Sequence, residues 1–264
     1  MAELAEGAGL PTLQPERLRD EETLAWLRAR EADVFLVASY GELLTEAVLE
    51  IPRLECLNVH PSLLPRHRGA TPIPASILAG DEITGVSIQR MVLELDAGDV
   101  LVAMETSLEP TENAGELAAR LAELSGEASV AALRALDEGT AEFVPQDGER
   151  ATFCKKLTKE HGRIDWRHAA VELDRHVRAM TPWPGATTSL PGGQDLTVLR
   201  ALPVERDAAE PGTILAVGKQ LEVATGEGAL RLVEVKPAGK RGMAAADFLR
   251  GARLEVGQLL GEAS

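Results

Sequence analysis

Apolar residues in the first half of the chain gather in short runs that are separated by amphipathic stretches. Residues 33–40 and 56–59 are continuously apolar or nearly so, whereas residues 85–92 alternate between apolar and polar positions. Continuous runs are typical of strands buried on both faces of a sheet, and alternation is typical of half-buried strands. Helical spacing fills the intervals, near residues 20–30, 45–49, 72–79 and 111–138. This alternation predicts an α/β fold with a doubly wound, mostly parallel (Rossmann-like) sheet.

The pattern changes after residue 150. A basic stretch comes first, a helix is predicted near residues 169–180, and short apolar segments then alternate with turn signals such as Pro191-Gly-Gly and Pro211-Gly212. Short strands at such spacing are typical of a small β-barrel. We therefore expect two domains, residues 1–148 and residues 149–264, the second an OB-like barrel, with residues 139–150 as a linker.

Charge supports this division. The formal net charge is −15, residues 1–150 carry 28 of the 42 acidic side chains, and all six lysines lie in the second part. An acidic first domain is not expected to bind nucleic acid unaided, so a nucleic-acid surface in the second domain has to be a local patch. The two cysteines are too few for a disulfide framework or a zinc site, and no apolar run reaches membrane-spanning length. We expect a cytoplasmic protein that binds neither metal nor membrane.

Asn58 and His60 are the first candidates for chemistry, because they lie two positions apart at the end of a predicted strand. That spacing places both side chains on one face, at the sheet edge where α/β proteins bind ligands. One interpretation is a pair that makes only structural hydrogen bonds. The other is a pair that stabilises a developing oxyanion, with His60 also moving a proton. Asp96 lies in an Asp-Ala-Gly turn that is ordinary by itself, yet a carboxylate near His60 would raise the pKa of the imidazole.

The loop after His60 offers two further groups of residues. Ser62-Leu63-Leu64-Pro65 is either a surface loop pinned by proline or an apolar wall for a flat ring ligand. Arg66 and Arg68 are either solvated charges or contacts for the phosphates of a nucleic acid.

The run from Asn58 to Pro65, Asn-Val-His-Pro-Ser-Leu-Leu-Pro, resembles the signature of the 10-formyltetrahydrofolate-dependent formyltransferases, and the longer run to Pro72 resembles methionyl-tRNA formyltransferases. Residues 156–166, 182–185 and 236–251 resemble the second domain of the same family. The resemblance implies a monomer that uses 10-formyltetrahydrofolate as co-substrate and initiator methionyl-tRNA as partner. It implies catalytic roles for Asn58, His60 and Asp96, and folate contacts from Ser62, Leu63, Leu64, Pro65, Tyr40 and Gly41. Contacts to tRNA are expected from Arg66, Arg68, Lys155, Lys156, Lys159, Lys240 and Arg241.

Two alternatives stay open. The core motif is shared by formyltransferases that act on a sugar amine or a purine precursor, and an inactive folate- or tRNA-binding remnant would keep it as well. Family members carry a strand, a helix and a second strand ahead of the point where this sequence starts, and one such unit takes roughly 30 residues or more. We therefore expect either a misplaced start codon or a fragment with poor activity.

Overall fold

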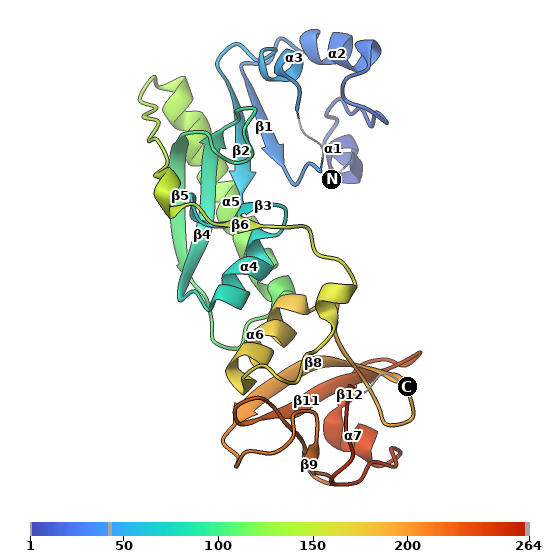
Figure 1. Cartoon of the computed structure of the whole chain (residues 1–264). Helices are drawn as coiled ribbons and strands as arrows, with labels where there is room; N and C mark the ends of the chain where they lie inside the picture. Colours follow the sequence, from blue (N-terminus) through green and yellow to red (C-terminus); the bar gives the residue numbers. More distant parts are fainter. Residues whose placement is uncertain (1, 42–43, 262–264) are drawn as a thin grey trace.

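The computed structural model describes residues 2–41 and 44–261, and its two parts lie end to end (Figure 1). The first part is built on a four-stranded sheet in the order β1-β2-β4-β5. The strands span Val34–Ala38 (β1), Glu55–His60 (β2), Ile83–Arg90 (β4) and Val100–Ser107 (β5). β2 lies inside the sheet, so both of its neighbours fix the direction of its side chains.

The α/β class is confirmed, but the strand directions are mixed. β1 pairs with β2 in parallel, whereas β2 with β4 and β4 with β5 are antiparallel. The expected parallel return needs a crossover that carries the chain back along the sheet. Here the helix between β2 and β4 has only eight residues and the chain enters β4 beside the end of β2, where His60 pairs with Ser87.

The helices of the first part span Ala2–Gly7 (α1), Glu21–Arg28 (α2), Glu46–Leu49 (α3), Pro72–Ala79 (α4) and Ala114–Asp137 (α5). Among them, α5 packs against β4 and β5, and α4 contacts α6 (Ala170–Met180) of the second part. α5 begins at a capping box, in which Asn113 accepts hydrogen bonds from the N–H groups of Gly115 and Glu116 while the Glu116 carboxylate bonds back to Asn113. Its buried Leu117 and Leu121 belong to the core cluster that also holds Val86 and Ile88 of β4.

The second part is a curled antiparallel sheet in the order β7-β8-β11-β10-β9, with β12 paired to β11. Its strands span Ala186–Ser189 (β7), Asp195–Val204 (β8), Ile214–Ala216 (β9), Leu221–Ala224 (β10), Ala229–Pro237 (β11) and Met243–Ala244 (β12). Helix α6 (Ala170–Met180) lies between this sheet and α4, and α7 (Ala245–Leu249) follows β12 (Figure 1). The expected second domain rich in β-strands is confirmed, as a half-barrel.

The segment between the two parts packs against the first sheet. We call residues 143–154 the strap. Val144 exchanges backbone hydrogen bonds of 2.9 Å with Val100 of β5, and β6 (Phe153–Cys154) pairs in parallel with β3 (Arg68–Gly69). Single 3-10 turns span Gly148–Arg150 and Glu160–Gly162. Residues expected to form a linker therefore cross the edge of the first sheet (Figure 1). None of the helices in the described ranges has the length and apolarity that a membrane crossing needs.

Candidate active site

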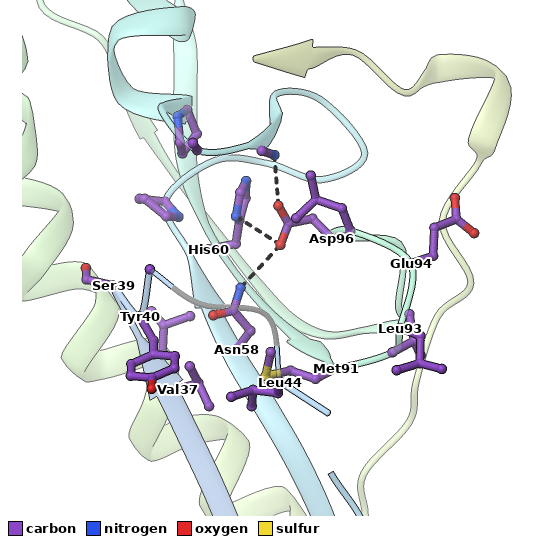
Figure 2. Close-up of a pocket in the computed structure, with 18 of the residues that line it drawn as sticks. Val37, Ser39, Tyr40, Leu44, Asn58, His60, Met91, Leu93, Glu94 and Asp96 are labelled. Atoms are coloured by element: carbon purple, nitrogen blue, oxygen red, sulfur yellow. Dashed lines mark hydrogen bonds and ion pairs between the residues drawn. The ribbon is translucent and has the colours of Figure 1, made fainter. Parts of the chain in front are cut away.

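Strand β2 presents Asn58 and His60 to a cleft of about 480 Å³ (Figure 2). The alternation of side chains along a strand puts both on the same face. They are surrounded by the end of β1 with the residues that follow it, by the loop after β3 and by the turn that carries Asp96. The spacing read from the sequence therefore produces two polar groups that face one cavity.

Asp96 approaches these two side chains from the turn between β4 and β5. Its Oδ1 lies 3.5 Å from Asn58 Nδ2 and 3.7 Å from His60 Nδ1 (Figure 2). The residue has φ of +50°, a left-handed conformation that aspartate tolerates better than most side chains. The structure thus brings together the three residues that the sequence singled out for catalysis.

The hydrogen bond on the far side of the His60 ring determines which of its two nitrogens carries the proton. Nε2 lies 3.0 Å from the backbone oxygen of His67, and a carbonyl oxygen only accepts, so Nε2 carries a proton. In the neutral ring Nδ1 is then free to accept a proton, and it is Nδ1 that faces Asp96. Burial lowers the pKa of His60, and this effect outweighs the raising effects of Asp96 and of the His67 carbonyl. Asp96 thus raises the pKa of His60 as expected, but burial of the ring has the larger effect and the net direction is down.

Neutral donors hold the Asp96 carboxylate. Oδ2 accepts the backbone N–H of Gly69 at 2.8 Å, and Oδ1 accepts Gln89 Nε2 at 3.0 Å. Gln89 in turn receives a hydrogen bond from Gln146 of the strap. The sequence analysis missed both glutamines. The available signal was an amide, Gln89, inside a predicted strand, and the structure buries it.

The cleft walls are mostly apolar, and two of the residues predicted to bind folate are among them. Tyr40 and Gly41 line the cleft, together with Val37, Leu44, Leu49, Met91 and Leu93 (Figure 2). Ser62, Leu63, Leu64 and Pro65 are not among its lining residues.

Contacts with β4 hold the first three of these residues. The Ser62 hydroxyl is buried and donates to the Arg66 carbonyl at 2.7 Å, and Ser87 of β4 bonds to the backbone of both Ser62 and Leu64. Leu63 packs where a side chain on Gly85 would stand. Leu63 is thus accounted for by packing on the sheet.

The predicted basic residues fall into two groups. Arg68 has a side chain only 6% exposed, bonded to Gln146 and 3.7 Å from Glu94, so it does not face solvent. Arg66 is about half exposed but pairs with Asp81 at 2.5 Å. The remaining five are exposed: Lys155, Lys156, Lys159, Lys240 and Arg241. Within the described ranges, no three metal-binding side chains gather at one point.

This geometry suits transfer of an acyl-type group to a nucleophile that loses a proton. An amide donor and an unprotonated ring nitrogen lie at the wall of one cleft, and both point toward the same carboxylate oxygen, Asp96 Oδ1. The amide can stabilise an oxyanion, the ring can take a proton, and the carboxylate can stabilise the imidazolium that results.

Comparison with known proteins places this site in a family context. Residues 2–133 match the family model described as formyl transferase, and residues 156–253 match the model of the formyl transferase C-terminal domain. HypX from Aquifex aeolicus, solved with tetrahydrofolic acid, is similar in structure with a TM-score of 0.64 and 22% identity, over 86% of this chain and 39% of that one. This chain therefore spans about two fifths of the length of HypX.

Sugar N-formyltransferases are also similar. The N-formyltransferase from Helicobacter canadensis, solved with folinic acid and dTDP-3-aminofucose, has a TM-score of 0.64 and 12% identity over 87% of this chain and 80% of that one. A likely sugar N-formyltransferase from Mycobacterium tuberculosis has a TM-score of 0.61 and 23% identity over 78% and 92%. At these identities the likeness concerns the fold, whereas the two family models together span both parts of the sequence. The chain belongs to the formyl transferase family.

Proposed function

We propose that this protein transfers the formyl group of 10-formyltetrahydrofolate to an amine, and that Asn58, His60 and Asp96 catalyse the transfer. The observation that carries the proposal is the approach of Asn58 Nδ2 and His60 Nδ1 to within 3.5 and 3.7 Å of one carboxylate oxygen, at the wall of the same cleft. Folate binding is supported by the apolar walls of the cleft. Tyr40 and Gly41 are the proposed folate contacts from the predicted set.

Each of the three side chains has a role in the proposed steps. The neutral amine attacks the formyl carbon, and Asn58 Nδ2 donates to the oxygen as it becomes negative. His60 Nδ1 accepts the proton that the attacking nitrogen loses, and Asp96 stabilises the resulting imidazolium. The bond between the formyl carbon and the folate nitrogen then breaks, and the ring returns its proton to that leaving nitrogen.

The acceptor we propose is the α-amino group of initiator methionyl-tRNA. It is supported by the resemblance of residues 58–72 and 236–251 to methionyl-tRNA formyltransferases, and by the exposed cations Lys155, Lys156 and Lys159. Lys240 and Arg241 form a further exposed pair in the turn between β11 and β12. Arg68 is left out of the proposed tRNA contacts, because its guanidinium is buried.

A sugar amine is the second candidate. It is supported by the similarity to sugar N-formyltransferases, which extends over 80% and 92% of two of those chains. No comparable observation favours a purine precursor.

One assay separates these acceptors. The full chain is incubated with 10-formyltetrahydrofolate carrying a labelled formyl group, together with methionyl initiator tRNA, with a dTDP-amino sugar, or with neither. Labelled formylmethionyl-tRNA is the expected product. Label on the sugar alone would make a sugar amine the acceptor in place of methionyl-tRNA. Label on neither amine would contradict the whole proposal, including its catalytic residues.

The tRNA contacts have their own test. Replacing Lys155, Lys156 and Lys159 together with alanine removes three exposed cations, so the slope of log Kd for tRNA against log salt should fall by roughly 1 for each phosphate that is no longer neutralised. Lys219→Ala is the matched control, since Lys219 is an exposed lysine in the β9–β10 turn. A triple variant with the same slope as this control would exclude these lysines as tRNA-binding residues.

A further inference from the structure

The side chain of Gln146 joins the strap to the turn that carries Asp96. Its Nε2 lies 2.9 Å from the backbone oxygen of Asp96, 2.6 Å from that of Gly98 and 3.2 Å from Gln89 Oε1. Its Oε1 accepts two hydrogen bonds from the Arg68 guanidinium, at 3.1 and 2.9 Å. Because a guanidinium only donates, Arg68 fixes the orientation of the amide, so that the NH₂ group has to face the three acceptors.

The rest of the strap holds the loop of residues 67–69, which also lines the cleft. Thr152 accepts the N–H of His67 through its hydroxyl at 2.8 Å and the N–H of Arg68 through its carbonyl at 2.8 Å. That loop supplies the two backbone groups that position the proposed catalytic side chains. The His67 carbonyl holds His60 Nε2, and the Gly69 N–H holds Asp96 Oδ2.

We infer that Gln146 is a positioning residue for the reaction, acting through the backbone of the Asp96 turn. The inference rests on the proposed function of this cleft. The strap lies between residues 133 and 156, outside both stretches that match the family models. The proposed catalytic residues all precede residue 134, yet the Asp96 turn and the loop of residues 67–69 are held by hydrogen bonds from this later segment.

The conformation of the turn explains why an external clamp is needed. Asp96 holds φ of +50°, and Gly98 passes so close to the backbone of Arg90 that an added Cβ would lie 1.8 Å from its carbonyl oxygen. Asp96 Oδ1 is already 3.7 Å from His60 Nδ1, so a further shift of the turn weakens the support for the imidazolium. A misplacement of about 1 Å costs on the order of 100-fold in rate.

Gln146→Glu tests this role with little change in shape. The carboxylate can still accept from Arg68, but it has no hydrogen to donate to the carbonyls of Asp96 and Gly98 or to Gln89. We expect kcat to fall roughly 10- to 100-fold, with KM for the folate substrate within about twofold of the parent. Glu149→Gln is the control, since Glu149 is an exposed strap residue whose side chain makes no hydrogen bond or ion pair with the described residues. Gln146→Met, neutral and of similar length, replaces the glutamate variant if that variant does not fold.

A second readout does not depend on turnover. The ring of His60 is titrated by NMR in the parent and in Gln146→Met, which adds no charge, with Asp96 and His67 as the charged or titratable groups that influence it. If the clamp is released, Asp96 recedes and its raising effect weakens, so His60 should titrate at lower pH than in the parent. Equal kcat and equal His60 titration in variant and control would overturn the inference. A parent that formylates no amine, but whose His60 titration still responds to Gln146, would refute the proposed function and leave the positioning role standing.

Discussion

Asp96 and Glu222 are both removed from solvent, but the protein treats the two carboxylates in opposite ways. Glu222 in β10 is fully buried and accepts from two arginines, Arg206 at 2.6 and 2.8 Å and Arg231 at 3.0 Å. Asp96 is 13% exposed at a cleft, takes its short hydrogen bonds from a backbone N–H and a glutamine, and lies 3.7 Å from the ring of His60.

The difference separates a structural carboxylate from one that can act on a reaction. Two arginines neutralise Glu222, so its charge can contribute little to stabilising a positive charge that forms nearby. Neutral donors fix the position of Asp96 but leave its charge uncompensated, and that charge is available to an imidazolium formed at His60. The contrast predicts that changes near Asp96 alter rate more than stability, and that changes at Glu222 do the reverse.

The largest expected effect is on rate, at the cleft. Asn58→Ala removes the proposed oxyanion donor, so kcat/KM should fall about 100- to 1000-fold, or ~2.7–4 kcal/mol. The only hydrogen bond of its side chain to the described residues is 3.5 Å long, so the free energy of unfolding should change by less than about 1 kcal/mol.

The other asparagine of the chain is the matched control. Asn113 caps α5, and Asn113→Ala should lower the free energy of unfolding by about 1 kcal/mol while leaving kcat/KM unchanged. Steady-state kinetics and urea denaturation of both variants check the pair. A similar loss of rate in both variants would remove Asn58 from the proposed mechanism.

The second effect is on stability, in the other part of the molecule. Glu222→Gln weakens the charge-assisted hydrogen bonds from Arg206 and Arg231, so the free energy of unfolding should fall by about 1.5–3 kcal/mol. kcat at 25 °C should remain that of the parent. Glu205→Gln, at an exposed glutamate next to Arg206, should change neither quantity. If Glu222→Gln lowered kcat as well, the proposed separation between the two carboxylates would not hold.

The smallest expected effect is a difference in the pH range over which the histidines and Glu222 contribute to the free energy of unfolding. Burial lowers the pKa of His60 and of His176 below 6.5, so the unfolded chain binds more protons and stability is lost as the pH falls below about 6.5. Burial would raise the pKa of Glu222, but hydrogen bonds from Arg206 and Arg231 leave it below 4.5, so its contribution is lost only below about pH 4.5. Each unit of displacement corresponds to about 1.4 kcal/mol.

Denaturation of the parent and of Glu222→Gln at several pH values tests this separation. Both proteins should lose stability equally between about pH 6.5 and 5, and only the parent should show the full further loss below pH 4.5. A variant that differs from the parent throughout the upper range would show that Glu222 titrates in a different environment from the one described.

The sequence was sufficient to predict those features of the fold and the site that depend on local geometry. Asn58 and His60 share a face because strand side chains alternate, and the apolar runs that became β1 and β2 were visible as patterns. Strand direction was not readable, because hydrophobic periodicity is the same for parallel and antiparallel strands. The role of Gln146 was also hidden, since it depends on a contact with residues about 50 positions earlier in the chain.

Two predicted groups were misplaced for a common reason. Leu63 and Arg68 belong to a loop that was expected to face ligand, but Leu63 packs on β4 and Arg68 turns inward to Gln146. A loop's composition indicates which contacts its residues can make, whereas the fold decides which side of the loop is buried.

The strap has a practical consequence for engineering this protein. Grafting one relative's half-barrel onto another's first sheet would test whether the half-barrel carries the proposed acceptor preference. A joint placed at residue 139 or 148 would divide a segment whose residues hold the walls of the cleft, so the graft would exchange those contacts together with the half-barrel. A joint after Cys154 keeps Val144, Gln146 and Thr152 with the sheet they serve.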